Sequence, residues 1–484
     1  TDCDLITFWK RRSHLTDLVV DMIPPDFSYI QKILLPLFYT IQMSVTGTVL
    51  GIFFALVLSP FGAANLGFPA VIRRILRIVI QILRSFPALI LALTATFLFG
   101  LGTFAGTFAI TLYTFAIMTK LTYEDASAAD VKAYQALRAM GVSKYVAYIH
   151  GILPEIIPGF LTNALYLLET NVRHSSILGY VGAGGIGLLL NEKISWLEYD
   201  KVGTILLMLF LTVCVIEYFS RYLAALIRKE RTIKKEQARL LLLFLAALFL
   251  ICTFTLSLPD FSRTSPQTLR NMFAGFLQPD WSFFFSAAKD GLGYLLLETV
   301  CIAFIGTVIG AIVSAPLAFL NTKRFVPAPV SFLFNLVIMV IRSVPFLVYG
   351  LIFIRVSGPG AFTGVLTLAM CSIGLLTKRF TECLDMLDPG PYRALIAMGV
   401  SPLAAIRHAV LPQIAPAFGS AVLYRFDVNI REASVLGLVG AGGIGAPLIF
   451  AMNKYDWSRA GAILLGLILL VWMVDVVSGK LAQT

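Results

Sequence analysis

The chain reads SSILGYVGAGGIG at residues 175–187 and ASVLGLVGAGGIG at residues 433–445. Other landmarks recur at the same separation of 258 residues, as in the pairs Arg84 and Arg342, Lys120 and Lys378, and Pro154 and Pro412. One register relates residues from about 70–228 to residues from about 328–480. A repeat of this length indicates an internal duplication, which in membrane proteins commonly builds two halves around one pathway.

The composition is that of a membrane protein. Hydrophobic residues make up 58% of the chain and charged residues 13%, whereas ordinary globular domains carry about 25% charge. Apolar runs such as 41–58, 240–258 and 461–477 approach the ~20 residues that cross a bilayer core. We interpret the net charge of +11 as basic cytoplasmic loops and not as a nucleic-acid surface. The six cysteines form no CxxC pair, so we expect neither a metal site nor a disulfide framework.

Each repeat contains five predicted crossings, and one further apolar run joins the repeats. The crossings of the first repeat lie near 34–58, 78–99, 104–122, 155–179 and 201–227. Those of the second lie near 291–318, 330–354, 361–380, 412–437 and 459–480, and the linker crossing is 239–257. Because five crossings reverse the direction of the chain, one linker crossing gives the repeats the same orientation. The sequence thus predicts an all-α, polytopic membrane protein with about 11 crossings in two parallel five-helix repeats.

The expected domain organisation follows from the charges. The segment RKERTIKKEQAR (228–239) carries six basic residues and is placed in the cytoplasm by the positive-inside rule. The segment WKRRSHL (9–15) then falls outside, against that rule, and we expect a further crossing before residue 1; no secretory signal pattern opens the chain. The domains are an extracytoplasmic segment (1–33), a first repeat (34–228), a cytoplasmic linker and linker helix (229–258), a second extracytoplasmic segment (259–290) and a second repeat (291–484).

Two polar segments between crossings three and four are predicted to lie in the cytoplasm. They contain YQALRAMGVSKYVAYIHGILP (134–154) and YRALIAMGVSPLAAIRHAVLP (392–412). A glycine with positive φ ends a first helix, and the serine two residues later caps a second helix. The following proline begins the next crossing, where its missing N–H costs little. Each segment is therefore expected to form a bent two-helix elbow, which we call an elbow from here on.

The elbows resemble the EAA loop of ABC-importer permeases, in which a glycine is followed at a set distance by Leu-Pro. In that family the elbow fits into a cleft of a cytoplasmic ATPase, so the resemblance implies that two ABC ATPase subunits dock here. The other interpretation is an interfacial helical hairpin. Gln135 and Arg393 stand where the family has glutamate. The implied coupling residues are Gln135, Gly141, Leu153, Pro154, Arg393, Gly399, Leu411 and Pro412.

Neither repeat contains the pattern GxxxxGK[ST], so no P-loop is expected in this chain. We expect that the chain is not an enzyme and binds no cofactor. ATP and Mg would bind to the partner ATPase subunits.

The glycine-rich loops end transmembrane helices, which argues against nucleotide binding because that fingerprint needs a βαβ unit. Glycines permit positive φ and close backbone approach, as in a re-entrant element that lines a protein-enclosed path. The alternative is close helix packing through small residues. The candidate gate residues are Gly182, Gly184, Gly185, Gly187, Gly440, Gly442, Gly443 and Gly445.

Charged residues precede each loop. Glu169 and Arg173 are four residues apart, as are Asp427 and Arg431, so each pair shares a helix face. Either the pairs are structural, or the two arginines meet across a pseudo-twofold axis and help to pass an anion. The segments RSFP (84–87) and RSVP (342–345) place further arginines before a proline. The candidate pathway residues are Arg84, Ser85, Asn171, Arg173, Arg342, Ser343, Asn429 and Arg431.

Both repeats contain the motif N-[IV]-R-x-[AS]-S-[IV]-L-G-x-VGAGGIG, at 171–187 and 429–445. This motif most closely resembles the phosphonate-type permeases of the ABC superfamily. The resemblance covers nearly the whole chain and implies an ATP-driven importer of phosphonate or a related phosphorus oxyanion in the bacterial cytoplasmic membrane. It also implies an extracytoplasmic solute-binding protein as partner, besides membrane lipid. Two alternatives stay open: an ABC permease for methionine or an osmoprotectant, and an ion-coupled secondary transporter.

Overall fold

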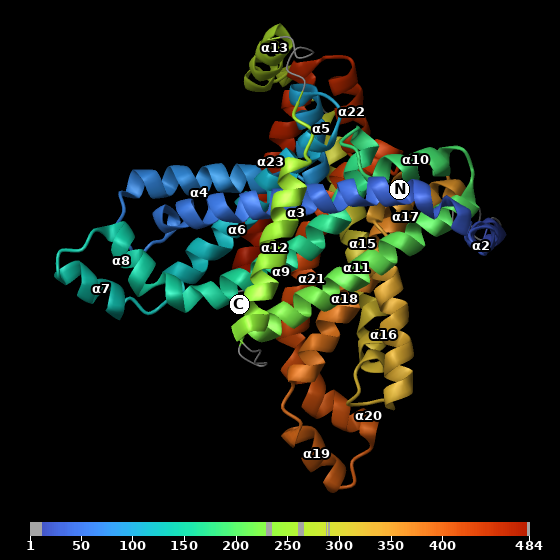
Figure 1. Ribbon diagram of the computed structural model, residues 1–484. Coiled ribbons are helices and arrows are strands. Elements are labelled where there is room, and N and C mark those ends of the chain that lie inside the picture. Colours follow the sequence, from blue (N-terminus) through green and yellow to red (C-terminus); the bar gives the residue numbers. More distant parts are fainter. Residues whose placement is uncertain (1–11, 229–234, 260–265, 287, 289–290, 482–484) are drawn as a thin grey trace. The chain divides into compact units, whose positions relative to one another are not determined.

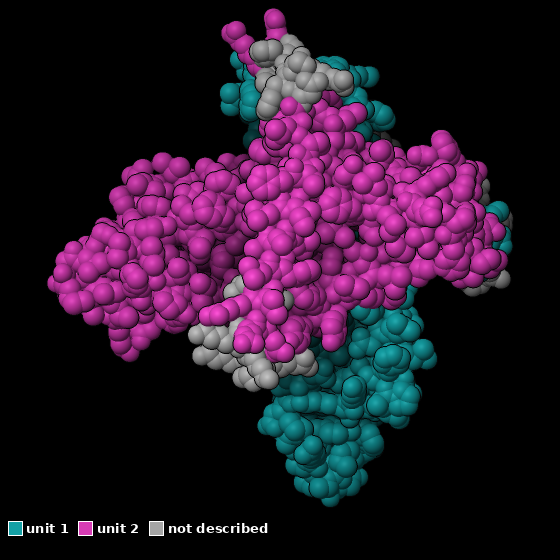
Figure 2. Space-filling view, viewed as in Figure 1, with its two compact units in different colours: residues 1–19, 271–484 teal, residues 20–270 magenta. Residues whose placement is uncertain are grey.

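The structure is a computed structural model that describes residues 12–228, 235–259, 266–286, 288 and 291–481. All regular secondary structure in these residues is helical (Figure 1). The chain divides into two compact units, residues 20–270 and residues 271–484 together with 1–19 (Figure 2). Residues 1–11 of the expected N-terminal segment and residues 229–234 of the basic segment 228–239 lie outside the described residues.

The unit 20–270 is built on two long helices that pack closely along their lengths. Gly47 and Gly51 of α3 face Ile110 and Thr114 of α6, and a Cβ added at either glycine would lie 2.8 or 2.7 Å from these side chains. Such close approach through small residues is typical of membrane helices. The helices are η1 (Phe27–Tyr29), α3 (Ile30–Gly62), α4 (Ala70–Ser85), α5 (Ala88–Phe99), α6 (Thr103–Ala128), α7 (Lys132–Ala139), α8 (Lys144–Gly151), α9 (Leu153–Leu178), η2 (Gly179–Val181), α10 (Ile186–Ser195), α11 (Tyr199–Ile227) and α12 (Lys235–Phe254).

The second unit repeats this packing. Gly306 and Gly310 of α15 approach Leu368 and Ser372 of α18 in the same way. Its helices are α14 (Trp281–Phe284), α15 (Leu292–Asn321), α16 (Ala328–Ser343), α17 (Phe346–Ser357), α18 (Ala361–Met386), α19 (Gly390–Ala397), α20 (Pro402–Ala405), the π-helix η4 (Ile406–Val410), α21 (Leu411–Leu436), η5 (Gly437–Val439), α22 (Gly445–Asn453) and α23 (Trp457–Leu481). Two further helices are α2 (Arg12–Asp21) and α13 (Pro266–Leu277).

The first helix of each repeat follows a register one residue different from the rest. Gly47 and Gly306 hold equivalent places at a separation of 259, whereas the repeat separation after this helix is 258. The difference arises in the connection to the next helix, which spans 63–69 in the first repeat and 322–327 in the second. The connection therefore changes length without disturbing the pairing of the helices that flank it.

Each of the predicted crossings falls on a helix or on a bent pair of helices. Six described helices are long and apolar enough to cross a membrane, and up to nine spans result if each bent pair counts as one. The predicted crossing at 412–437 corresponds to α21, which carries several charges. The linker crossing corresponds to α12, whose apolar part is Leu243–Phe254. This helix packs on the first repeat, because Gln42 Nε2 donates to the carbonyl oxygen of Cys252 at 3.1 Å.

The crossings predicted at 78–99 and 330–354 are bent and not straight. α4 meets α5 at 94°, and α16 meets α17 at 87°. Pro87 and Pro345 lack the N–H that would continue the helix, and the residue before a proline is driven to extended conformation. Phe86 adopts φ −86° and ψ 126° for this reason, and Val344 adopts φ −75° and ψ 124°.

Candidate functional site

The first elbow is fastened to the connection between α3 and α4. Its glycine, Gly141, has φ +81°, and Ser143 caps α8 by accepting from the N–H of Val146 at 3.4 Å, as predicted. The Tyr134 hydroxyl donates to the carbonyl oxygen of Leu66 at 2.6 Å. Burial raises the pKa of Tyr134, so this hydroxyl stays protonated and keeps donating.

The second elbow has the same hinge but different attachments. Gly399 has φ +82°. Ser401 holds the predicted N-cap position of α20 but makes no side-chain cap hydrogen bond, and α20 passes after four residues into a π-helix. Pro402 stands at the position of Lys144, whose ammonium group donates to the carbonyl oxygen of Gly67 in the first repeat. The second elbow therefore lacks the side-chain hydrogen bond by which Lys144 fastens the first elbow.

The predicted coupling residues occupy similar places in both elbows. Gln135 and Arg393 are exposed on α7 and α19. The Leu-Pro pairs begin α9 and α21, with the proline in the first helical turn, as the sequence predicts. Docking of a partner on these residues stays a prediction.

The glycine-rich loops are tied into their own repeats. Gly102 N donates to Gly182 O at 3.0 Å, and Ile186 N donates to Thr40 Oγ1 at 2.8 Å. The matching bonds of the second repeat are Gly360 N to Gly440 O (2.9 Å) and Ile444 N to Thr299 Oγ1 (3.1 Å). Within the two loops, positive φ is found at Gly182, Gly184, Gly185, Gly440, Gly442 and Gly443.

The remaining loop glycines serve close packing. A Cβ at Gly187 would lie 2.3 Å from Ser176 O, and one at Gly445 would lie 2.5 Å from Ser434 O. Close packing is thus seen directly, while a gating role stays a prediction.

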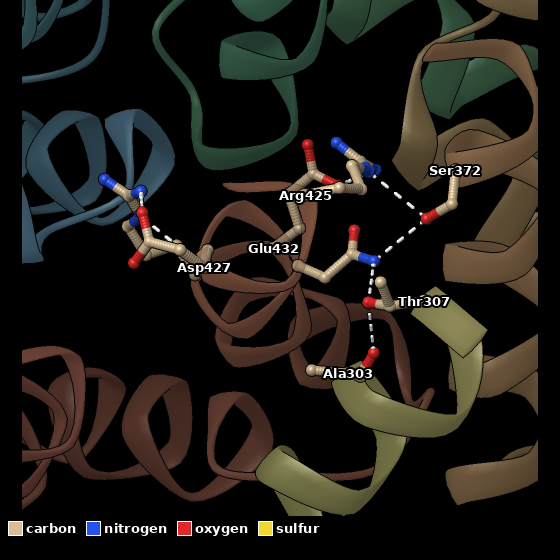
Figure 3. A network of polar contacts seen from close by, with 8 residues as sticks. Ala303, Thr307, Ser372, Arg425, Asp427 and Glu432 are labelled. Atoms are coloured by element: carbon tan, nitrogen blue, oxygen red, sulfur yellow. Dashed lines mark hydrogen bonds and ion pairs between the residues drawn. The ribbon is translucent and has the colours of Figure 1, made fainter. Parts of the chain in front are cut away.

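The two predicted asparagines are fully buried, and each joins three helices of its repeat. Asn171 Nδ2 donates to Thr48 and Thr114, both at 2.8 Å. Asn429 Nδ2 donates to Thr307 at 2.6 Å and to Ser372 at 2.9 Å. Thr307 donates in turn to the carbonyl oxygen of Ala303 at 2.6 Å (Figure 3). The amide donors are occupied by hydroxyls of their own repeat, and a role toward an anion stays a prediction.

The predicted ion pairs are present on another face of the same helices. Arg173 Nη2 lies 2.9 Å from Glu169 Oε1, and Arg431 pairs with Asp427. Residues two positions apart on an α-helix point about 200° apart, so these pairs face away from the asparagines. Arg173 Nη1 is buried and has no hydrogen-bond partner among the described residues. The structure thus separates the candidate arginines from the candidate asparagines.

A further buried ion pair occurs in the second repeat and was not predicted. Arg425 Nη2 lies 2.8 Å from Glu432 Oε2, and Arg425 Nε donates to Ser372 Oγ at 3.2 Å (Figure 3). The side chains are 4% and 16% exposed, which makes this one of the most deeply buried ion pairs that the structure describes. Their spacing of seven residues places both on the face of α21 that carries Asn429, and this spacing was the signal in the sequence.

The arginines before the prolines are half-buried, and their neighbouring serines are engaged within their own helices. Ser85 Oγ donates to Gln81 O at 2.9 Å, and Ser343 Oγ donates to Val340 O at 2.7 Å. Arg84 Nη1 reaches Gln81 Oε1 at 3.4 Å. Their part in a substrate pathway stays a prediction.

A charged cluster lies where α10 meets α11, in a segment that begins outside the predicted crossings. Glu198 pairs with Lys201 at 2.8 Å and with Lys193 at 2.9 Å. Hydrogen bonds from Lys201 and Lys193 lower the pKa of the Glu198 carboxyl. The ammonium group of Lys193 also lies 4.2 Å from the ring centroid of Trp196.

Comparisons with known proteins match the chain to membrane components of transport systems. The family described as "Binding-protein-dependent transport system inner membrane component" matches residues 47–232 and 306–482. The phosphate-import permease protein PhnE of Mycolicibacterium smegmatis is 27% identical over 474 residues, which cover 96% of this chain and 88% of that protein. The phosphite transport system permease protein PtxC of Stutzerimonas stutzeri is 35% identical over 208 residues, 43% of this chain and 74% of that protein. The protein named "Putative cryptic phosphonate transport system permease protein PhnE2" of Escherichia coli is 37% identical over 119 residues, 25% of this chain and 98% of that protein.

Proposed function

This chain belongs to the family of binding-protein-dependent transport system inner membrane components, and on that premise we propose that it forms the membrane passage of an ATP-driven importer of a phosphorus oxyanion. It is a multi-pass protein of the bacterial cytoplasmic membrane. The observation that carries the proposal is the elbow, which is built twice with a glycine at φ +81° and +82°. Two matched elbows offer equivalent docking sites to a pair of partner subunits.

The substrate class is supported by the relatives and by one unsatisfied donor. The relatives are named for phosphate, phosphite and phosphonate transport. Arg173 keeps one buried guanidinium nitrogen without a hydrogen-bond partner in the described part of the chain. A guanidinium group presents several donors in a plane and suits the oxygens of a phosphorus oxyanion.

The proposed transport cycle draws its energy from outside this chain. Two ABC ATPase subunits bind ATP and Mg, and their closure moves both elbows. An extracytoplasmic solute-binding protein delivers the anion. The chain itself carries out no covalent chemistry and holds no cofactor.

The test is uptake by proteoliposomes that contain this chain, its ATPase and its solute-binding protein. We expect ATP-dependent uptake of a labelled phosphonate, phosphite or phosphate that persists when proton and sodium gradients are collapsed. Uptake that follows the ion gradient, or that is selective for methionine, would replace the proposal by one of its alternatives.

The coupling role of the hinge is tested at Gly141 and Gly399. A Cβ at either position meets no atom within 4 Å, so a substitution disturbs only the backbone conformation and the contact with a partner. Valine resists positive φ, whereas asparagine tolerates it. We expect G141V to uncouple ATP hydrolysis from uptake and G141N to retain coupling. Equal coupling in both variants would argue against a hinge that transmits ATPase closure.

A further inference from the structure

Helix α4 presents a continuous apolar face to its surroundings. Six large apolar side chains are between 39% and 68% exposed, and they recur at the spacing of one helix face: Val71, Ile72, Ile75, Ile78, Val79 and Ile82. The helix has 16 residues and is long enough for a membrane span only together with α5. A surface of this kind is suited to contact with acyl chains.

Basic residues occupy the other side of α4 near its first turns. Arg77 donates from Nε and Nη2 to Gly62 O at 3.0 and 2.8 Å, and its guanidinium lies 5.0 Å from the ring centroid of Tyr123. Arg73 Nη1 donates to Ala64 O at 3.4 Å. Arg74 is exposed and makes no hydrogen bond or ion pair within the described residues. The guanidinium groups of Arg73 and Arg77 thus reach back to the end of α3 and the connection 63–69, and Arg74 lies beside them in sequence.

These cations have no acidic partner in the described part of the chain. Arg73, Arg74 and Arg77 form no ion pair with a carboxylate there, and their hydrogen bonds go to backbone carbonyl oxygens. The ammonium group of Lys144, on the neighbouring elbow, likewise donates to Gly67 O. Four positive charges therefore gather around the connection 63–69 with their charge uncompensated. An anion at this corner would gain from all four charges.

The corresponding corner of the second repeat is different. The positions of Arg73, Arg74 and Arg77 are taken by Ser331, Phe332 and Asn335, and Lys144 is replaced by Pro402. A carboxylate is present instead, because Thr322 Oγ1 donates to Asp385 Oδ1 at 2.6 Å in that connection. The connection of the second repeat carries two cations, Lys323 and Arg324, beside the Asp385 carboxylate. The first repeat gathers four cations that have no carboxylate partner in the described residues.

We propose that the corner formed by the start of α4 and the connection 63–69 binds the phosphate headgroup of an anionic phospholipid. The headgroup lies against Arg73, Arg74 and Lys144, and the acyl chains lie along the apolar face of α4. The coincidence of an exposed apolar face with uncompensated charge at one end of the same helix matches the two parts of such a lipid. A soluble oxyanion also carries negative charge, but it has no acyl chains to contact the apolar face of α4.

The experiment uses the full chain in nanodiscs of phosphatidylcholine, with and without phosphatidylglycerol. Lipid retention is measured by native mass spectrometry and thermal stability by tryptophan fluorescence. The variants are R74Q, whose side chain has no internal bond to lose, and R73Q/R74Q. The matched control is K323Q, which removes one exposed positive charge from the connection of the second repeat.

We expect the affinity for phosphatidylglycerol to fall by about fivefold for each arginine removed, with K323Q retaining the binding of the unmodified chain. Equal losses in K323Q and R74Q would overturn the proposal, because binding would then follow total charge. A second arm adds inorganic phosphate or methylphosphonate to phosphatidylcholine nanodiscs. Stabilisation by these soluble anions that R74Q abolishes, without phosphatidylglycerol binding, would also overturn it and assign the corner to a soluble oxyanion.

Discussion

The two repeats solve the same packing problem with different chemistry. Around Asn171 the first repeat places Leu167 and His174, and the His174 ring lies edge-on to Tyr113 with centroids 5.2 Å apart. At the equivalent positions the second repeat places Arg425, Glu432 and Cys371. The asparagine and its two hydroxyl partners are common to both. The shared amide thus holds the helices together, while its surroundings have diverged from an aromatic contact to an ion pair.

The largest effect is expected from breaking the ion pair. E432L leaves Arg425 buried without its counter-charge, which costs about 3–5 kcal/mol. The double variant R425L/E432H introduces the residues of the first repeat and should recover most of this loss. Unfolding of the purified chain in detergent measures both. A double variant as unstable as E432L would show that the first-repeat chemistry cannot be transplanted.

A smaller effect, equal in the two repeats, is expected at the shared asparagines. N171A and N429A each remove an amide that donates to two buried hydroxyls, so each should cost about 1–3 kcal/mol. The same unfolding assay compares them. A much larger loss for one of them would mean that the surroundings, and not the amide, set the stability of that repeat.

The two elbows are expected to differ by about 1 kcal/mol in the stability that each loses when its tyrosine hydroxyl is removed. Y134F removes the hydroxyl that donates to Leu66 O, and loss of one hydrogen bond costs about this amount. Y392F is the matched control, because Tyr392 packs its ring against Phe325 and its hydroxyl makes no hydrogen bond in the described residues. Hydrogen exchange at the elbows should show faster opening in Y134F alone. Similar exchange in both variants would contradict the unequal fastening of the elbows.

The smallest effect concerns pH. The pKa of Glu198 is lowered in the folded chain, so its ion pairs stabilise the fold above the ordinary carboxyl pKa and cease to do so as pH falls through the lowered value. E198Q should therefore be slightly less stable than the unmodified chain at neutral pH and indistinguishable from it in acid. Thermal unfolding across this pH range measures the difference. A constant difference at every pH would exclude the carboxylate charge as its cause.

Sequence patterns predict the elements whose causes are local. The positive φ of Gly141 and Gly399 and the pairing of Glu169 with Arg173 follow from neighbouring residues. Contacts across the repeat are not encoded in this way. Nothing near Asn171 in the sequence indicates Thr48 or Thr114. The identical Gly-Val-Ser segments place a serine at the N-cap of a helix in both elbows, but only Ser143 accepts a hydrogen bond there.

The bends at Phe86 and Val344 have a consequence for solvation. A straight helix hides its peptide groups from hydrocarbon, whereas a near right-angle turn interrupts the ladder of backbone bonds partway along a span. Hydrocarbon cannot satisfy the groups that such an interruption frees, so each bend has to meet either other parts of the protein or water. At these two bends Ser85 and Ser343 are buried, so the protein itself shelters the freed peptide groups from hydrocarbon.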